Sequence, residues 1–247
     1  MKLYSELAEY YFTIEEASRK FSEEILFLRD TFKRHKIHTI LDIGCGTGEH
    51  IKELQGMGFK PLGVDGSPRM LEIAKVRFPH CQFELGKMEV YVAKQPVDAV
   101  ICLYGTFNYL INDDLVQNFL RNCHKNLKQA GLLVLEIWNA DPIHRIKRKP
   151  ITTVSNVRQG DTSIRRNRGF RLTRADDVAI VEVSVCVYNL NQKDLKDKHT
   201  MRVFHFPQVQ NFLDDNKFDV LHVYSNYDGE KYIKTGARML IVAKKRS

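Results

Sequence analysis

Two short segments that combine glycines with an acidic residue could hold a small ligand. The run Leu41-Asp-Ile-Gly-Cys-Gly-Thr-Gly48 places three glycines directly after an apolar segment. Further along, Val64-Asp-Gly-Ser67 ends a second apolar segment on Asp65. Glycines let backbone N–H groups and a helix start approach a ligand, and a carboxylate at the next strand end can accept two ribose hydroxyls. The pair predicts a nucleoside-containing cofactor.

The spacing of the glycines separates two kinds of cofactor. A dinucleotide loop reads G-x-G-x-x-G and holds a pyrophosphate, whereas this loop reads G-x-G-x-G and follows Asp42. It resembles motif I of the class I S-adenosylmethionine-dependent methyltransferases, and Val64-Asp-Gly-Ser67 resembles their second motif. The resemblance implies that Asp42 contacts the ammonium of the methionine part and that Asp65 binds the ribose. A plain strand-turn-helix with tightly packed glycines is the alternative interpretation.

Alternating strands and helices must position these segments. Apolar spacing and capping residues predict helices over 14–34, 47–57, 67–78, 112–128 and 207–216. Apolar runs predict strands over 38–43, 59–64, 81–85, 97–103, 131–138, 218–224 and 237–243. Near-continuous apolar strands between helices indicate a sheet covered on both faces. We therefore predict an α/β, doubly wound, Rossmann-like seven-stranded sheet, and the family resemblance implies an antiparallel C-terminal hairpin.

Residues 141–206 depart from this alternation. They contain strand-like runs at 151–157, 163–172, 178–190 and 200–206, which predict a small antiparallel β insertion. The predicted domains are a methyltransferase core, 1–140 and 207–247, with an N-terminal helical lid over about 1–36, and the insertion 141–206. In the resembling enzymes such an insertion covers the substrate site.

Most of the chain's positive charge falls in this insertion. Residues 141–206 carry fourteen Lys and Arg against seven Asp and Glu, while the whole chain has a formal charge of +8. The basic residues gather in two runs, 144–149 and 165–174. Three interpretations stay open: a solvated outer sheet face, a site for an anionic small substrate, and a surface that binds nucleic acid.

The order of features along the whole chain supports a closer resemblance. After the glycine loop come Gly86-Lys-Met-Glu, Leu103-Tyr-Gly-Thr-Phe-Asn-Tyr-Leu110 and Leu133-Val-Leu-Glu-Ile-Trp138, then the insertion, a helix and the hairpin. This order is similar to small-molecule methyltransferases related to nucleotide-amino-sugar N,N-dimethyltransferases and, more distantly, to glycine N-methyltransferase. The resemblance implies S-adenosylmethionine as cofactor and S-adenosylhomocysteine as product. It also implies in-line methyl transfer to a small-molecule acceptor, and we expect an amine nitrogen.

The resemblance also nominates site residues. We expect the acceptor to be lined by Tyr104, Asn108, Tyr11 and Glu136, and Tyr109, Trp138 and Asn139 are further candidates. We expect the cofactor to be held by Tyr10 and Arg19 of the lid, by Asp42, Gly44, Cys45, Gly46, Thr47 and Gly48, by Asp65, Gly66 and Met70, and by Lys87, Met88 and Leu103. One position departs from the family, which commonly has Gly-Asp-Met where this chain has Gly86-Lys-Met88. Because lysine cannot accept a hydrogen bond from the adenine amino group, that contact must come from backbone, Glu89 or water.

Two alternative functions remain. One is an RNA methyltransferase that uses the basic insertion. Enzymes that methylate exocyclic base nitrogens resemble one another in an (Asp/Asn)-Pro-Pro-(Tyr/Phe) turn after the fourth strand. This chain has Leu103-Tyr-Gly-Thr-Phe-Asn-Tyr109 there, which counts against that reaction but leaves other RNA chemistry open. The second alternative is a cofactor-binding protein of the same fold that does not catalyse.

Composition is that of a globular enzyme. Hydrophobic residues make up 43% and charged residues 28% of the 247 residues. No run approaches the roughly 18 apolar residues of a membrane span, and the first residues lack a secretory apolar region. The five cysteines form no C-x-x-C pair, and the nine histidines form no ligand cluster. We expect a cytoplasmic protein with reduced cysteines, no bound metal and no membrane contact.

Overall fold

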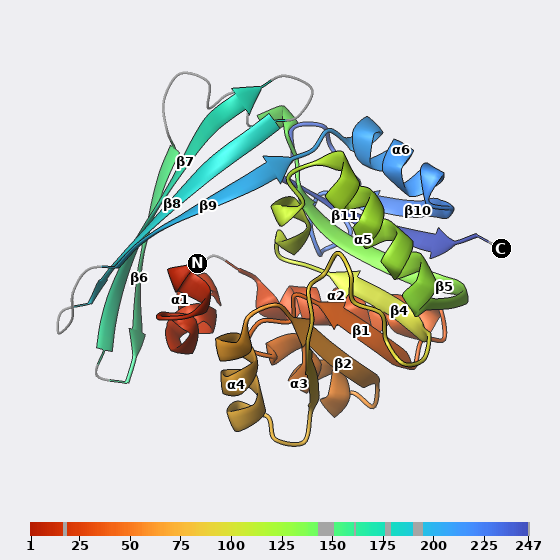
Figure 1. The fold of residues 1–247 in the computed structure, drawn as a ribbon, viewed down its shortest axis with the longest axis horizontal. Coiled ribbons are helices and arrows are strands. Elements are labelled where there is room, and N and C mark those ends of the chain that lie inside the picture. The colour runs from red at the N-terminus through yellow and green to blue at the C-terminus, as the bar shows by residue number, and fades with distance from the viewer. Residues whose placement is uncertain (17–18, 143–150, 161, 176–178, 190–194, 247) are drawn as a thin grey trace.

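The protein has a large mixed sheet and a small antiparallel sheet, with the N-terminal segment between them (Figure 1). The structure is a computed structural model, and it describes residues 1–16, 19–142, 151–160, 162–175, 179–189 and 195–246. The large sheet has the order β10-β11-β5-β4-β1-β2-β3, and the small sheet has the order β6-β7-β8-β9.

The large sheet confirms the predicted doubly wound fold. Strands β1 to β5 run parallel, β11 is antiparallel to β5, and β10 is antiparallel to β11. Their bounds are β1 (Thr39–Ile43), β2 (Lys60–Asp65), β3 (Gln82–Leu85), β4 (Val97–Cys102), β5 (Leu127–Trp138), β10 (Phe218–Tyr224) and β11 (Arg238–Lys245).

Helices cover both faces of the large sheet, which explains why its central strands are mostly apolar. One face packs Phe119 of α5 and Val209 of α6 into a cluster with β1, β4, β5 and β11. The opposite face packs Leu28 of α2 and Leu54 of α3. The helices are α1 (Tyr11–Glu16), α2 (Phe21–Arg34), α3 (Glu49–Gly56), α4 (Pro68–Arg77), α5 (Asp113–Asn126) and α6 (Phe206–Asp215), with short 3-10 turns η1 (Lys2–Tyr4), η2 (Ala8–Tyr10) and η3 (Thr106–Tyr109).

Local sequence fixes several helix starts. The Ser67 hydroxyl accepts a hydrogen bond from the Met70 N–H at 3.3 Å, and Pro68 occupies the first helical position of α4. The Asn112 side chain caps α5 in the same way, through the Leu115 N–H at 2.9 Å. Both helices therefore begin where the sequence predicts.

The single helix expected over 14–34 is wrong, because α1 and α2 are separate elements. Lys20 leaves the helical region, with φ −110° and ψ 65°, immediately before α2. The helical spacing of apolar residues continues across the break, because α1 and α2 each bury an apolar face. The two faces pack on different surfaces. Ile14 packs beneath the small sheet, whereas Leu28 packs on the large one.

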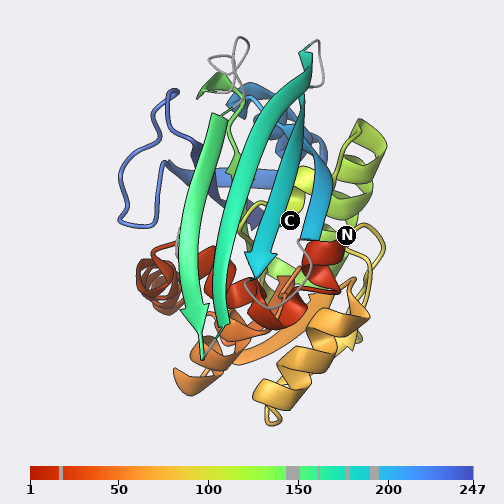
Figure 2. The same ribbon diagram turned by 90° about the vertical axis from the view of Figure 1, so that its left-hand side faces the viewer.

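The small sheet confirms the predicted β insertion and lies across the N-terminal segment (Figures 1 and 2). All its neighbouring strands are antiparallel. Alternate residues of β7, among them Ile164 and Arg166, are buried against the core. The strands are β6 (Ile151–Gln159), β7 (Thr162–Ala175), β8 (Ala179–Asn189) and β9 (Leu195–Val203).

The five cysteines are all free. In the part of the chain that the structure describes, no helix is both long and apolar enough to cross a membrane. Among the same residues, His, Cys, Asp and Glu side chains form no group of three or more that could hold a metal ion.

Candidate active site

The glycine loop forms an open cradle at the carboxyl end of β1. Gly44, Gly46 and Gly48 have φ of 82°, 57° and 88°, a backbone region that other residues rarely adopt. The Gly44 and Cys45 N–H groups donate to the Val64 carbonyl at 2.7 and 3.1 Å, which fixes the loop to β2. A Cβ on Gly44 would come within 2.7 Å of the Thr106 hydroxyl oxygen, so only glycine fits there.

Asp65 ends β2 beside this cradle and lines the main cavity. Its carboxylate accepts hydrogen bonds from the Gly46 N–H at 2.9 Å and from the Ser67 N–H at 2.8 Å. Burial raises the pKa of the Asp65 carboxyl, and the backbone donors oppose that shift. The expected ribose-binding carboxylate therefore points into the cavity, with its orientation set by backbone.

Asp42 is a buried carboxylate with an unused oxygen. Its side chain is 2% exposed, and Oδ2 has no hydrogen-bond partner among the described residues. Burial raises the pKa of the Asp42 carboxyl to about 6. Asp42 lines a small cavity of about 30 Å³ beside the loop, together with Arg19 and Tyr104. A buried orphan acceptor beside a glycine cradle fits a cationic ammonium group.

Arg19 closes this small cavity from the N-terminal segment. It pairs with Glu24, its Nη2 lies 3.3 Å from His50 Nε2, and its guanidinium lies 4.0 Å from the centre of the Tyr104 ring. Its side chain is 5% exposed. These contacts fix the guanidinium next to the loop, at the side of the site where the resemblance places the methionine part of the cofactor.

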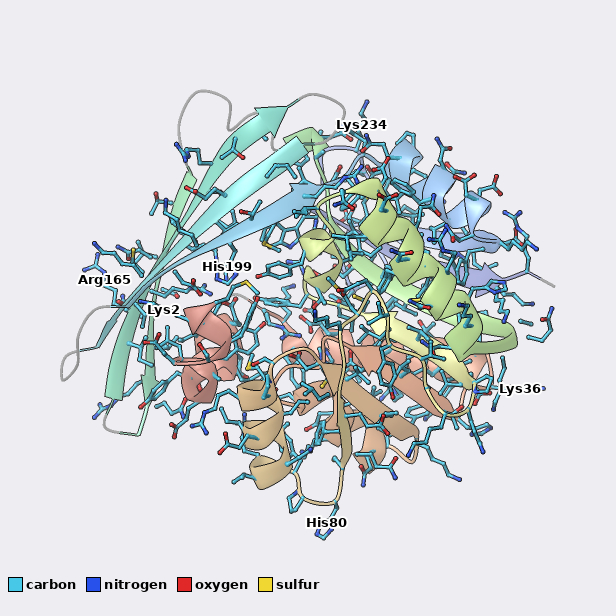
Figure 3. All side chains as sticks on the ribbon, in the orientation of Figure 1. Lys2, Lys36, His80, Arg165, His199 and Lys234 are labelled. Atoms are coloured by element: carbon cyan, nitrogen blue, oxygen red, sulfur yellow. The ribbon has the colours of Figure 1, made fainter. Side chains whose placement is uncertain are left out.

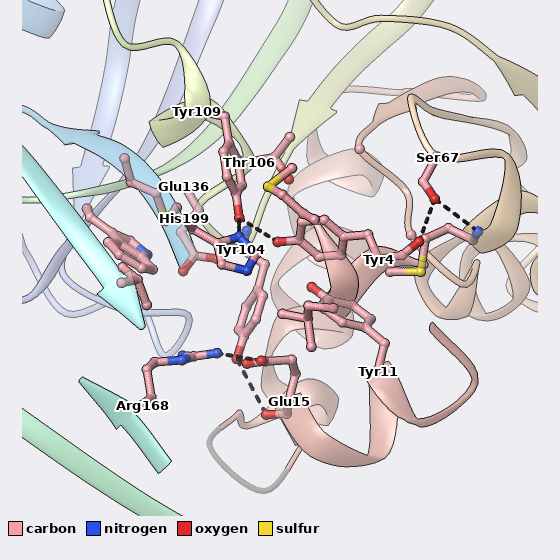
Figure 4. A pocket seen from close by; sticks show the side chains of 18 of the residues that line it. Tyr4, Tyr11, Glu15, Ser67, Tyr104, Thr106, Tyr109, Glu136, Arg168 and His199 are labelled. Carbon is pink, nitrogen blue, oxygen red and sulfur yellow. Dashed lines mark hydrogen bonds and ion pairs between the residues drawn. The ribbon is translucent and has the colours of Figure 1, made fainter. Parts of the chain in front are cut away.

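The main cavity has a volume of about 920 Å³ and runs from the glycine loop to the inner face of the small sheet (Figure 4). Its large-sheet end is lined by expected cofactor residues: Gly44, Gly46, Asp65, Gly66, Met70, Lys87 and Met88. Lys87 is exposed, and Glu89 also lines this end. The Gly86 N–H donates to the Asp65 carbonyl at 3.0 Å, which holds this segment beside the loop.

Three of the four expected acceptor residues, Tyr11, Tyr104 and Glu136, line the main cavity. The Tyr104 backbone has φ 53°, and its N–H donates to Glu136 Oε2 at 3.0 Å. Glu136 also accepts from the Tyr227 hydroxyl at 2.5 Å and pairs with Arg238 at 3.0 Å. Glu136 therefore holds the main chain of the Tyr104 loop in its unusual conformation.

Asn108, the fourth expected acceptor residue, lies outside both cavities. It is fully buried, its Nδ2 donates to the Arg202 carbonyl at 2.7 Å, and its Oδ1 accepts from the Trp138 N–H at 3.1 Å. It joins η3 to β9 and β5. This placement supports a positioning role and gives no support to a direct contact with the acceptor.

The remaining expected cofactor residues divide in two groups. Cys45, Thr47 and Leu103 line the small cavity, and the Thr47 hydroxyl donates to the Glu49 carboxylate at 2.7 Å. Tyr10 and Gly48 line neither cavity: Tyr10 packs against the cluster beneath the small sheet, and Gly48 caps α3.

The inner face of the small sheet contributes residues that the sequence interpretation did not nominate. Arg166 and Arg168 of β7 pair with the Glu15 carboxylate of α1, at 2.8 Å for Arg166. Tyr104 donates its hydroxyl to Glu15 Oε2 at 2.8 Å. His199 of β9 lines the same cavity. The alternation of β7 places the two arginines on one face, but it does not tell which face points inward.

The basic run 165–174 is therefore split between two faces. Arg165 and Arg171 are exposed on the outer face, whereas Arg166 and Arg168 face the cavity. Figure 3 shows Arg165 on the outer side of the small sheet and His199 on the side that faces the core. The other basic run, 144–149, lies outside the described residues.

Comparison with known proteins agrees with this geometry. Residues 40–131 match a family described as methyltransferase domain. A stretch of 100 residues is 31% identical to dTDP-4-amino-2,3,4,6-tetradeoxy-D-glucose N,N-dimethyltransferase from Saccharopolyspora spinosa, and this match covers 40% of each chain. The chain thus aligns with less than half the length of that relative.

Solved structures extend the likeness in fold to nearly the whole chain. An S-adenosylmethionine-dependent methyltransferase from Clostridium acetobutylicum has a TM-score of 0.79 at 18% identity, with 99% of each chain covered. The amino pentose methyltransferase CalS10 from Micromonospora echinaspora, solved with S-adenosylmethionine bound, has a TM-score of 0.71 at 21% identity, with 95% and 98% covered. Residues 40–131 thus match the methyltransferase domain family, and nearly the whole chain shares the fold of S-adenosylmethionine-dependent methyltransferases.

Proposed function

We propose that this protein transfers a methyl group from S-adenosylmethionine to an amine nitrogen of a small molecule. The orphaned, buried Oδ2 of Asp42 beside the glycine cradle is the observation that carries the proposal. An uncompensated buried carboxylate is costly, and the ammonium of the methionine part would compensate it. When bound, the cofactor supplies an electrophilic methyl group on sulfur.

The chain's own residues bind and orient the cofactor in this proposal. Asp65 accepts the ribose hydroxyls, Asp42 and Arg19 hold the amino-acid end, and Met70 and Met88 pack beside the nucleoside. Tyr11 and Tyr104, supported by Glu136, wall the passage between this end of the cavity and the inner face of the small sheet. Alignment and exclusion of water are the main tasks of such a site.

The choice of a small acceptor rests on the elements that line the cavity. The N-terminal segment and the small sheet roof it, and Arg166 and Arg168 of the basic run face inward. A cavity of about 920 Å³ has room for the cofactor together with a compact acceptor. The relatives named above act on amino sugars by their names, which supports an amine nitrogen on a small molecule.

Calorimetric titration with S-adenosylmethionine tests the cofactor assignment. We expect the intact protein to bind and Asp65→Ala to bind about 10- to 100-fold more weakly, since hydrogen bonds to a carboxylate are worth roughly 1.5–3 kcal/mol. Asp215→Ala, which changes an exposed carboxylate on α6, is the matched control and should bind as the unchanged protein does.

The acceptor class is tested by incubating the protein and cofactor with three probes: dTDP-amino sugars, glycine and a mixed RNA pool. Mass spectrometry then detects the methylated product and S-adenosylhomocysteine. We expect methylation of an amine among the small probes. Methylation of RNA alone would contradict the proposed acceptor class, and the absence of cofactor binding would contradict the whole proposal.

A further inference from the structure

A chain of four polar side chains runs along the wall of the main cavity. The Tyr4 and Tyr109 hydroxyl oxygens lie 2.7 Å apart, and the Tyr109 hydroxyl lies 2.6 Å from His199 Nδ1. On the other side of the ring, His199 Nε2 lies 3.1 Å from Asp197 Oδ2. Tyr4, Tyr109 and His199 all line the cavity (Figure 4). The proposed function gives them no role so far.

The carboxylate sets the direction of this chain. Asp197 Oδ2 also accepts the Leu3 N–H at 2.8 Å, so an ionised Asp197 acts only as an acceptor. Although the 3.1 Å contact is not an aligned hydrogen bond, the negative charge of Asp197 favours the His199 tautomer with the proton on Nε2, which leaves Nδ1 as an acceptor for the Tyr109 hydroxyl proton. Tyr109 oxygen in turn accepts the Tyr4 hydroxyl proton. The Tyr4 oxygen then keeps acceptor capacity on the cavity side.

The electrostatic surroundings keep His199 neutral. Burial lowers the pKa of the His199 imidazole, and Arg168 of β7 and the terminal amine of Met1 lower it further, while Asp197 opposes them. The other titratable groups that face the ring are Tyr4 of η1 and Tyr109 of η3. Burial raises the pKa of both phenols, so they stay protonated and pass a proton on without holding a charge.

We infer that Tyr4, Tyr109, His199 and Asp197 form a relay that removes a proton from the amine acceptor. The inference rests on the proposed function. The acceptor enters as its ammonium form: an N–H bond of this cation breaks and its electron pair stays on nitrogen, while the proton passes to the Tyr4 oxygen. Tyr4 gives its own proton to Tyr109, and Tyr109 gives its own to His199 Nδ1. The products are a neutral amine and an imidazolium that Asp197 stabilises.

The direction of the hydrogen bonds is tested in the absence of a methyl acceptor, by NMR titration of the His199 ring. In the proposed tautomer Tyr109 donates to the neutral ring, so Tyr109→Phe should raise the pKa of His199. Asp197→Asn should lower it, because the carboxylate stabilises the imidazolium. Tyr224→Phe, which changes the ring stacked on His222 on β10, is the matched control and should leave the His199 pKa unchanged.

The catalytic part is tested with whichever amine probe the unchanged protein methylates. We expect Tyr109→Phe and Tyr4→Phe to lower kcat by about 100-fold, in the range usual for proton-transfer groups, with KM changed by less than about threefold. The kcat of the unchanged protein should rise with pH through the His199 pKa, because only the neutral ring accepts a proton.

Failure of the relay and failure of the proposed function give different results. If an amine is methylated and Tyr109→Phe retains its kcat within about threefold, the relay is overturned and the function stands. If no amine is methylated, the function fails and the titration still decides the hydrogen-bond order. A fall or no change in the His199 pKa in Tyr109→Phe would overturn the relay in either case.

Discussion

At the scale of single residues, Asp42 lowers the stability of the folded protein and is expected to bind the cofactor's ammonium group. Its carboxyl is buried with one oxygen unpartnered, and burial raises its pKa to about 6. An ordinary aspartate in an unfolded chain titrates near 4. The folded protein therefore binds this proton more tightly than the unfolded chain does, and the unfolding free energy falls as pH rises from about 4 to about 6.

Asp42→Asn should separate these two effects. At pH 7.5 the change removes the buried charge, and we expect the unfolding free energy to rise by on the order of 1 to 3 kcal/mol, as the pKa shift implies. The same change should weaken S-adenosylmethionine binding about 10- to 100-fold, because the ammonium loses its carboxylate. Urea unfolding and calorimetry measure the two quantities.

The pH dependence supplies the control for Asp42→Asn. The cofactor affinity of the unchanged protein should decline as pH falls below about 6, where the Asp42 carboxyl takes up a proton. The affinity of Asp42→Asn should not show this decline, because it has no carboxyl at this position. A variant that is destabilised and binds the cofactor normally would contradict this assignment.

At the scale of elements, the loop between β1 and α3 depends on close approach as well as on positive φ. Gly44 has φ 82°, and a Cβ there would meet Thr106, whereas Gly58 has φ 88° and nothing within 4 Å of its added Cβ. The two positions share one backbone requirement and differ in the space around them. They form a matched pair.

Gly44→Ala should therefore destabilise the protein more than Gly58→Ala. We expect about 1 kcal/mol for Gly58→Ala, from the left-handed backbone alone, and about 3 kcal/mol for Gly44→Ala, because overpacking adds to it. Urea unfolding of the two variants measures the difference. Equal losses would show that the approach of Thr106 is not what requires glycine in the loop.

Elements with a simple pattern could be predicted from the sequence. The strands that carry Asp42 and Asp65 are mostly apolar because both sheet faces are covered, so the sequence alone predicts them and the cradle that follows. The break between α1 and α2 could not be found, because Ile14 and Leu28 keep helical spacing while they pack on different sheets.

The inner wall of the site was harder to predict than the glycine loop. Arg166 and Arg168 share one face of β7, but a period of two does not say which face is buried. That choice depends on Glu15, a residue about 150 positions away in the chain, which brings a carboxylate to both guanidiniums. The Asn108 amide could have bound the acceptor by its chemistry. In the structure it instead forms hydrogen bonds with the main chain of β9 and β5.

At the scale of the whole molecule, Glu15 connects three parts of the chain. It lies on α1, pairs with Arg166 and Arg168 of the small sheet, and accepts the hydroxyl of Tyr104 from the loop after β4. Burial raises the pKa of the Glu15 carboxyl, but the Arg168 and Arg166 guanidiniums outweigh burial and lower the pKa overall. Its contribution to stability is present above pH about 4.3 and is lost as pH falls through the lowered pKa.

Glu15→Gln should loosen the contact between the N-terminal segment and the small sheet. At pH 7.5 we expect the unfolding free energy to fall by about 3 to 5 kcal/mol, the usual loss when one partner of a buried ion pair is removed. Glu16→Gln, at the exposed neighbouring position, is the matched control and should change it by less than about 0.5 kcal/mol. Hydrogen exchange should show the lost protection in α1 and β7 first, since both depend on this carboxylate. Loss of protection that instead began in α5 or α6 would mean that the small sheet is held to the core by other contacts.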